Sequence, residues 1–271
     1  SDVNNYSVTD QSTTTANITA KSLTVSGITA SDKTYDGSTS ATLTGTAVYS
    51  GLVAGDTFDG SYTGVFSNAN VASGKTVNIT STYSGADVNN YSVTDQSTTT
   101  ASITQKALTA TASASNKTYN ATNSASVTLT LSGLIGSETL GSTNTSTFNN
   151  KNVGSNKTVT VNSITLADGS GLAANYLISA GQTTTANITP KALTVSGITA
   201  SNKIYDGNTV ATLSSSNVTY SGIVFGDSFA GSFSGSFSDK HIGTGKTVTI
   251  TSSYSGSDVS NYTITDQSSA T

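Results

Sequence analysis

The stretch Thr13–Val25 reads TTTANITAKSLTV, and the chain returns to it twice, at Thr98–Ala110 and at Thr183–Val195. The shared lysine recurs every 85 residues (106 − 21 = 85 and 191 − 106 = 85), at Lys21, Lys106 and Lys191. This period is too long for one turn of a solenoid and has the length of a small domain. The sequence therefore predicts a tandem series of similar modules.

The alternation of apolar residues changes phase inside this stretch. Ala16 and Ile18 share one face of a strand with period two, whereas Leu23 and Val25 have the opposite parity. One continuous strand cannot bury both pairs on one face, so the first half closes one module and the second half opens the next. We expect a kink between the halves, at Ala20, Gln105 and Pro190. Proline has no N–H for a ladder and is common at such joints, which are short enough to tether neighbouring modules closely.

These positions divide the chain. Residues 1–20 are the tail of a preceding repeat, followed by module 1 (21–105), a diverged module 2 (106–190) and module 3 (191–271), which lacks its last strand. The segment Asp2–Tyr6 matches Asp87–Tyr91, so the chain begins in the middle of a repeat. We therefore expect it to be an internal part of a longer polypeptide.

The expected fold class is all-β. No segment shows an apolar stripe of period 3.6, and short runs rich in Val, Thr and Tyr alternate with Gly, Asn, Asp and Ser. We predict small β-grasp-like or β-sandwich-like modules arranged as an extended rod. Each has room for one short helical turn, near Leu52, Leu134 and Ile223.

Composition narrows the function. The 271 residues carry a net charge of −4, their eleven basic residues are all Lys, and only 10% are charged, which argues against nucleic acid as a partner. No apolar run approaches the ~18 residues of a membrane-spanning helix, so direct membrane insertion is not expected. The chain has no Cys and no Met, which suits long exposure to oxidants outside the cell.

A tight turn is predicted twice, where an Asp-Gly pair separates two strand-like runs, because both residues tolerate positive φ. This structural turn motif consists of Tyr35, Asp36, Gly37, Tyr205, Asp206 and Gly207. Module 2 has Asn120 and Ala121 instead, so its turn is either of another type or strained.

A lysine lies two residues before the tyrosine of each of these three turns, at Lys33, Lys117 and Lys203. Its stem is expected to cover the ring while its ammonium reaches water; a covalent cross-link to Asn or Asp is the alternative.

Several motifs recur in one order. The chain repeats Lys-x-Tyr-Asp-Gly, Gly-Asp, Gly-Lys-Thr-Val, Asn-Tyr and the closure Thr-Thr-Ala-x-Ile-x-x-Lys-x-Leu-Thr. This series resembles the YDG-type repeat of large secreted bacterial surface proteins similar to filamentous haemagglutinins and other fibrillar adhesins. The resemblance covers essentially the whole chain, and it implies an exported, repetitive stalk with no catalytic residues.

Polar residues that could serve chemistry do not recur intact. The single histidine, His241, has Asn70 and Asn152 as counterparts, and Glu138 is the only glutamate. An enzyme is therefore not expected, and no cofactor is implied. Structural calcium remains an alternative, because Asp and backbone oxygens in Gly-rich loops bind it, although no Asp-x-Asp-x-Asp-Gly loop is present.

The sequence thus favours a structural stalk of an extracellular, bacterial cell-surface adhesin, which projects an adhesive tip and supports cell adhesion or biofilm formation. Its expected partners are neighbouring repeats of the same long chain. The alternative is a binding module whose exposed loops recognise a glycan or protein of a host or neighbouring cell. The ligand-facing loops would be Gly51–Asp56 and Gly222–Asp227, with Asp56 and Asp227 as candidate contacts.

Overall fold

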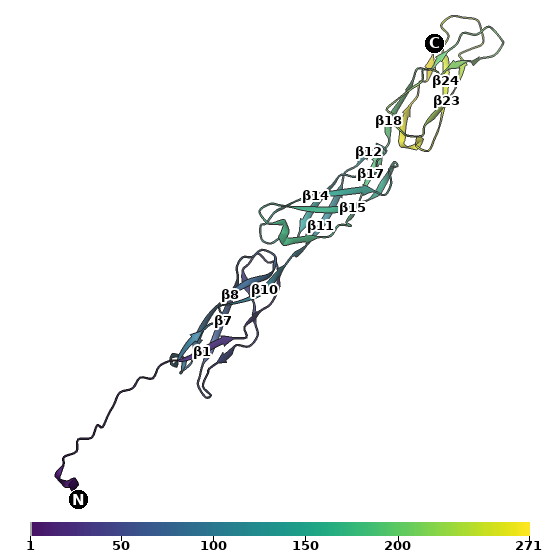
Figure 1. The fold of residues 1–271 in the computed structure, drawn as a ribbon. Coiled ribbons are helices and arrows are strands. Elements are labelled where there is room, and N and C mark those ends of the chain that lie inside the picture. Colours follow the sequence, from purple (N-terminus) through teal and green to yellow (C-terminus); the bar gives the residue numbers. More distant parts are fainter. Residues whose placement is uncertain (1) are drawn as a thin grey trace. The chain divides into compact units, whose positions relative to one another are not determined.

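The computed structural model describes residues 2–271, and the regular secondary structure of these residues is β-strand apart from four short 3₁₀ turns, as predicted (Figure 1). They form two compact units. Unit 1 comprises the chain up to Lys106 together with Ala174–Leu177, and unit 2 comprises Ala107–Ala173 with Ile178–Thr271. Three modules in the sequence thus become two packing units, because modules 2 and 3 share one of them.

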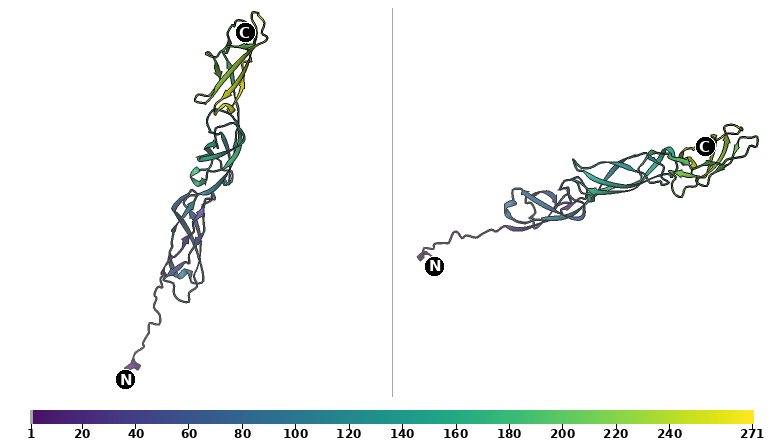
Figure 2. Two further views of the ribbon diagram at one scale, coloured as in Figure 1. Left: turned by 90° about the vertical axis from the view of Figure 1, so that its right-hand side faces the viewer. Right: turned by 90° about the horizontal axis from the view of Figure 1, so that it is seen from above.

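The N-terminal residues of unit 1 have no sheet partner. A 3₁₀ helix, η1 (Asp2–Asn5), is followed by residues 6–20 in no strand, an irregular trace that Figures 1 and 2 show leading to β1 (Lys21–Ser26). Ile18 in this trace is fully exposed. Its counterparts Ile103 and Ile188 are buried, so the same motif is solvated or enclosed depending on what surrounds it.

Module 1 contains two main sheets. One has the order β6-β1-β9, the second has the order β3-β10-β8-β7-β4, and β2 pairs with β5. The elements after β1 are β2 (Thr29–Ala30), β3 (Lys33–Thr34), β4 (Ser40–Ala41), β5 (Leu43–Thr44), β6 (Val48–Ser50), β7 (Asp59–Phe66), β8 (Ala72–Ser84), η2 (Val88–Asn90), β9 (Tyr91–Thr94) and β10 (Thr98–Thr104).

The core of module 1 lies between these sheets. Leu23 and Val25 of β1 alternate with exposed residues and pack in one buried cluster with Ile79 of β8. Phe58 completes the cluster, with its ring 5.8 Å from the edge-on ring of Tyr91. Two sheets facing each other across apolar side chains correspond to the sandwich-like form of the prediction.

Modules 2 and 3 repeat this plan. Module 2 contains a sheet of order β12-β17-β15-β14 and the antiparallel neighbours β11 and β13. In module 3 the sheets have orders β22-β18-β25 and β20-β23-β24-β26, with β19 paired to β21. The elements are β11 (Lys106–Ala114), β12 (Lys117–Thr118), β13 (Val127–Ser132), β14 (Leu140–Phe148), β15 (Gly154–Asp168), η3 (Ala173–Asn175), β16 (Tyr176–Ile178), β17 (Thr183–Thr189), β18 (Lys191–Ser196), β19 (Thr199–Ala200), β20 (Val210–Ala211), β21 (Leu213–Ser214), β22 (Thr219–Ser221), β23 (Ala230–Phe237), β24 (Val248–Ser255), η4 (Val259–Asn261), β25 (Tyr262–Thr265) and β26 (Ser269–Ala270).

The predicted change of phase is confirmed in unit 2. Ile188 is buried on β17 in one sheet, and Leu193 is buried on β18 in another, with Pro190 between the two strands. The change in parity of the buried residues therefore marks the point where the chain passes from one sheet to the next, because each strand buries only one of its two faces.

One short helical turn occurs in each module, but at another place than expected. The turns are η2, η3 and η4, directly before β9, β16 and β25, whereas Leu52, Leu134 and Ile223 lie outside any helix. The prediction at Leu52, Leu134 and Ile223 rested on the apolar residues of these loops. The observed turns instead carry the Asn of the Asn-Tyr pairs, whose side chains have partners described below.

The Tyr-Asp-Gly turn has the expected positive φ at its glycine, 75° at Gly37 and 80° at Gly207. In module 2, Ala121 adopts φ of 62°, so the turn keeps its type and its alanine is in the left-handed region. A Cβ in this region costs about 1–2 kcal/mol. The strained alternative is therefore the correct one.

Candidate functional site

The tyrosine that follows β12 is fixed by its own module. The Tyr119 N–H donates to the Thr189 carbonyl oxygen of β17 at 2.9 Å. The Lys117 ammonium closes the turn beyond it, donating to Asn120 Oδ1 at 2.9 Å and to the Thr122 carbonyl oxygen at 2.7 Å. These bonds fix the backbone and the turn at Tyr119, and the residue is only 1% exposed.

The ring of Tyr119 is covered by module 3. It meets the ring of Tyr262, the first residue of β25, edge-on, with centroids 5.6 Å apart and planes at 76°. The Tyr119 hydroxyl donates to Asp227 Oδ1 at 3.1 Å, and the Tyr262 hydroxyl donates to Asp227 Oδ2 at 2.5 Å. The Val224 N–H in turn donates to the Tyr262 oxygen at 2.9 Å. A motif residue of one module thereby completes a polar and aromatic cluster of the next.

Lys151 adds charge to this cluster. Its Nζ lies 3.0 Å from Asp258 Oδ1 and 3.7 Å from Asp227 Oδ1. The two carboxylates are 10% and 2% exposed, so without the ammonium they would be two nearly buried like charges. The Ser228 N–H and then Lys151 lower the pKa of Asp258, while Asp258 raises the pKa of Lys151. Burial, followed by the bond to Asp227, raises the pKa of Tyr262 to about 12.

Asn261 at the end of η4 makes the third contact. The residue is 1% exposed, its Oδ1 accepts the Val153 N–H at 2.9 Å, and its Nδ2 donates to Asn152 Oδ1 at 3.5 Å. An amide buried in this way satisfies a backbone donor of the other module and loses its partner if the modules separate.

Unit 1 contains a similar set of contacts. Asn175 is 2% exposed, and its Oδ1 accepts the Val71 N–H at 2.9 Å. The ring of Tyr35 meets that of Tyr176 edge-on, with centroids 5.3 Å apart. The Gln105 side-chain amide donates to the Tyr176 carbonyl oxygen at 3.0 Å. The Tyr–Tyr and Asn contacts therefore occur in both units.

One apolar cluster runs through the second joint. Its buried members are Tyr119, Phe148, Val159, Ala186 and Ile188 of module 2 and Leu193, Val195, Ile198, Ile250 and Tyr262 of module 3. We call Tyr119, Lys151, Asp227, Asp258, Asn261 and Tyr262 the joint cluster. The shared apolar core and the polar bonds across it restrict the movement of modules 2 and 3 relative to each other.

The tyrosines and the aspartates of the predicted turns differ in their surroundings. Tyr35 is 5% exposed, whereas Tyr205 is 59% exposed. Asp36 and Asp206 instead hold the turn itself, accepting from Lys33 at 2.8 Å and from Lys203 at 2.7 Å. The ammonium groups of these lysines also lie over phenylalanine rings, Lys33 over Phe66 at 5.6 Å and Lys203 over Phe237 at 5.8 Å. The expectation that the lysine stem covers the tyrosine stays a prediction.

The two loop aspartates differ in exposure. Asp227 was expected to face a ligand, but its carboxylate is 2% exposed and bonded within the joint cluster, so that expectation is wrong. The tyrosines of two modules enclose it. Asp56 is half-buried and accepts from the Tyr91 hydroxyl. Its proposed contact with a ligand stays a prediction.

Sequence reasoning missed Lys151, Asp258 and Asn261. A usable signal lay in the repeat alignment, since the counterparts of Lys151 and Asp258 are Ala69 and Leu172. The cation and one of its carboxylates are thus replaced together by apolar residues. Nothing local in the sequence, however, indicates that these positions meet.

The other candidate sites have ordinary surroundings. The main chain of His241 bonds to Asp239 and Lys246, in an exposed loop. Among residues 2–271 no three His, Cys, Asp or Glu side chains are gathered in a way that could hold a metal ion. Within the same described residues, no helix is both long and apolar enough to cross a membrane.

The comparison with family models gives one match, repeated three times. The model of the YDG domain matches residues 19–101, 104–186 and 189–270, which together make up most of the chain. Comparison with curated proteins and with solved structures gives no match. The tyrosine, aspartate and glycine of the turn and the Asn-Tyr pair lie inside the matched ranges. The chain therefore belongs to the YDG domain family, of which it carries three tandem copies.

Proposed function

We propose that this chain is a structural spacer, a rod-like stalk region in an extracellular adhesin of the bacterial surface. The observation that carries the proposal is the burial of Tyr119, which belongs to the turn of module 2 but is enclosed by module 3. The most distinctive residue of the repeat is thus used to hold the next repeat.

A spacer requires joints that resist bending. The joint in unit 2 has a continuous apolar core, an edge-on ring pair, a Lys–Asp pair and a buried Asn bond, and Pro190 alone separates the two strands that enter it. The packed rings and the buried amide restrict rotation about the linker more than a flexible tether would. Neighbouring repeats of the same chain are therefore its principal partners.

The cellular setting follows from the resemblance to repeats of secreted adhesins and from the composition. We propose that the stalk holds an adhesive tip away from a cell and so supports adhesion or biofilm formation. A chain without Cys or Met, with few charged residues, suits that exposed location.

A second candidate function is favoured by exposed apolar residues at the loop tips. Phe225 is fully exposed in the loop Gly222–Asp227, and Val53 is 44% exposed in the equivalent loop of module 1. Such residues can contact a glycan or a protein of another cell. A glycan-array screen of the chain beside a Phe225→Ser variant tests this function, and binding that disappears in the variant would favour it over a passive spacer.

Small-angle X-ray scattering tests the spacer. A compact chain of this length has a radius of gyration near ~18 Å, and three modules end to end should give roughly twice that value. The larger value, unchanged by moderate salt, would support the spacer. The smaller value would contradict it, because modules folded against each other cannot hold anything at a distance.

A further inference from the structure

The loop that carries Lys151 is held by bonds inside module 2. The Lys157 ammonium donates to Asn150 Oδ1 at 2.6 Å, and the same oxygen accepts the Asn152 N–H at 3.0 Å. Lys151 lies between the two asparagines in the sequence, and its side chain takes part in neither bond. The loop therefore keeps its structure whatever side chain occupies this position.

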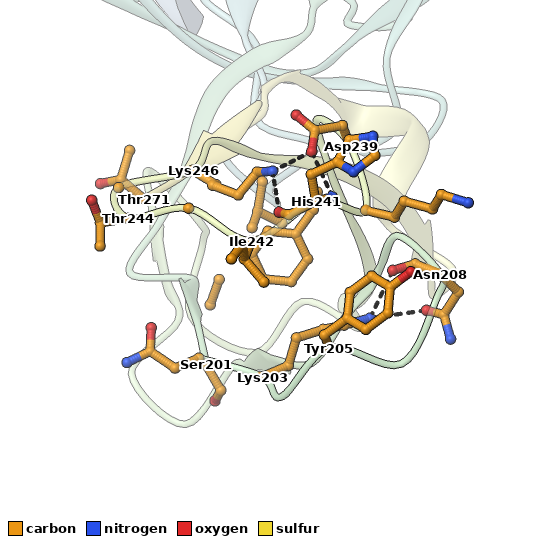
Figure 3. Close-up of a pocket in the computed structure, with 17 residues that line it drawn as sticks. Ser201, Lys203, Tyr205, Asn208, Asp239, His241, Ile242, Thr244, Lys246 and Thr271 are labelled. Atoms are coloured by element: carbon orange, nitrogen blue, oxygen red, sulfur yellow. Dashed lines mark hydrogen bonds and ion pairs between the residues drawn. The ribbon is translucent and has the colours of Figure 1, made fainter.

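Modules 1 and 3 have the same loop. In module 3 the Lys246 ammonium bonds to Asp239, whose Oδ1 also accepts the His241 N–H at 2.8 Å, and Figure 3 shows this arrangement. In module 1 the Lys75 ammonium donates to Asn68 Oδ1 at 2.7 Å. Each module thus fixes the loop by a lysine seven residues further along the chain.

One position of this loop varies between modules. Lys151 of module 2 corresponds to Lys240 in module 3 and to Ala69 in module 1. A loop of constant structure therefore carries an ammonium group in modules 2 and 3 and only a methyl group in module 1.

The face that Lys151 contacts varies in the same way. Asp258 Oδ2 accepts a backbone N–H of its own module at 3.0 Å, while Oδ1 lies 3.0 Å from the Lys151 ammonium. In module 2 the counterpart of Asp258 is Leu172, and Ser170 Oγ instead accepts the Thr139 N–H at 2.9 Å. Because a hydroxyl can make the bond inside the module, the carboxylate at this position is not needed for the module's own fold.

The two junctions of the chain are matched at these positions. Module 1, with Ala69, precedes the module that has Leu172, and module 2, with Lys151, precedes the module that has Asp258. Asp258 and its neighbour Asp227 are 10% and 2% exposed, and among residues 2–271 neither forms an ion pair with any cation but Lys151. An alanine in the preceding loop would therefore leave two nearly buried carboxylates without a counter-charge.

The opposite mismatch is milder. The side chain of Lys151 is 40% exposed, so a lysine that met an apolar face could keep its ammonium group in water. The requirement for a match thus comes mainly from the face with two aspartates.

We propose that Lys151 and Asp258 are the specificity-determining pair of the joint. The face formed by Asp227 and Asp258 accepts a preceding YDG module only if that module carries a lysine at this position of its loop. Module 1 lacks this lysine, so module 3 cannot follow module 1 directly, and module 2 belongs between them. This inference deepens the proposed function and rests on it, because a fixed order of modules matters in a spacer built from them.

A double-mutant cycle in the full chain tests the pair. Lys151→Ala gives module 2 the residue of module 1, and it should lower the midpoint of thermal unfolding of unit 2 by roughly 3–6 °C. Asp258→Asn removes the charge but keeps an oxygen for the backbone N–H. It should lower the midpoint in the original chain and raise it in the Lys151→Ala chain. Such a change of sign identifies charge matching, since a loss of packing would have the same sign in both.

Hydrogen exchange at the joint gives a local readout. The Val153 N–H is bonded to Asn261 Oδ1 across the joint, so its exchange reports separation of the modules. Lys151→Ala should accelerate this exchange roughly 10-fold, and the addition of Asp258→Asn should restore part of the protection.

Asp87→Asn is the matched control. Asp87 is the counterpart of Asp258 in module 1 and accepts the Thr57 N–H at 2.9 Å, but it belongs to the other packing unit. Its effect on stability should be the same with and without Lys151→Ala, because the two changes share no partner.

Two outcomes would overturn the proposal. One is an effect of Asp258→Asn that is equal in the two backgrounds, and the other is unchanged exchange of the Val153 N–H in Lys151→Ala. Both differ from failure of the spacer role, which small-angle scattering tests. An extended chain with an additive cycle would contradict the specificity pair alone, whereas a compact chain would contradict the spacer.

Discussion

Replacing Tyr119 by alanine is the sharpest test of the joint. The ring is 1% exposed, belongs to the cluster shared by modules 2 and 3, and meets Tyr262 edge-on. Truncation of a buried aromatic residue costs about 3–5 kcal/mol, and the loss of the hydroxyl leaves Asp227 with one donor fewer. We therefore expect Tyr119→Ala to reduce the free energy of unfolding of unit 2 by about 3–5 kcal/mol.

The chain provides its own control. Tyr205 has the same place in the turn of module 3 but is 59% exposed, so Tyr205→Ala should change stability by less than about 0.5 kcal/mol. Both variants would be followed by urea unfolding with circular dichroism, in dilute solution so that association does not contribute. A second probe, tyrosine fluorescence, would show whether modules 2 and 3 still unfold together.

Two results would refute the reasoning. One is an equal effect of Tyr119→Ala and Tyr205→Ala, which would place the role of the tyrosine inside its own turn. The other is a loss below about 1 kcal/mol for Tyr119→Ala, too small for a buried ring. Tyr119→Phe separates the ring from its hydroxyl, and it should cost about 0.5–1.5 kcal/mol, the usual range for a hydrogen bond.

The remaining predictions concern the turn, the ion pair and acid. Ala121→Gly should stabilise module 2 by about 0.5–1 kcal/mol, because it relieves the strain of a φ of 62°. Gly207→Ala should destabilise module 3 by a similar amount, because the new Cβ would meet nothing within 4 Å and only the backbone would be strained. Thermal unfolding measures both changes, and a shift of the same sign in the two variants would contradict the prediction. Lys151→Glu should lower the midpoint of thermal unfolding, less so in high salt, while Lys240→Glu in dilute solution should leave it unchanged; equal effects would show that the joint does not use the charge. Asp258 has a lowered pKa in the folded protein, so the unfolded state binds the proton first as the pH falls. The contribution of Asp258 to folding stability should therefore be complete above about pH 5 and be lost as the pH falls through the lowered pKa. Acid-unfolding curves of Asp258→Asn should show a weaker dependence on pH.

Much of the fold could be predicted because its determinants are local. Whether a residue faces the core depends on parity along a strand, so Ile188 and Leu193 revealed two sheets and a joint at Pro190. Positive φ depends on one residue and its turn, so Gly37 and Gly207 were assigned correctly, and Ala121 was recognised as anomalous.

The joint cluster could not be predicted, because it depends on residues far apart in the chain. Tyr119 and Asp258 are 139 positions apart and meet only after two modules have folded and docked. Strand parity and turn chemistry act over a few residues, so the all-β class and the change of sheet at Pro190 could be inferred from the local sequence. That Tyr119 enters a core shared with the following module could be learned only from the folded structure, because burial and charge pairing depend on distances in space.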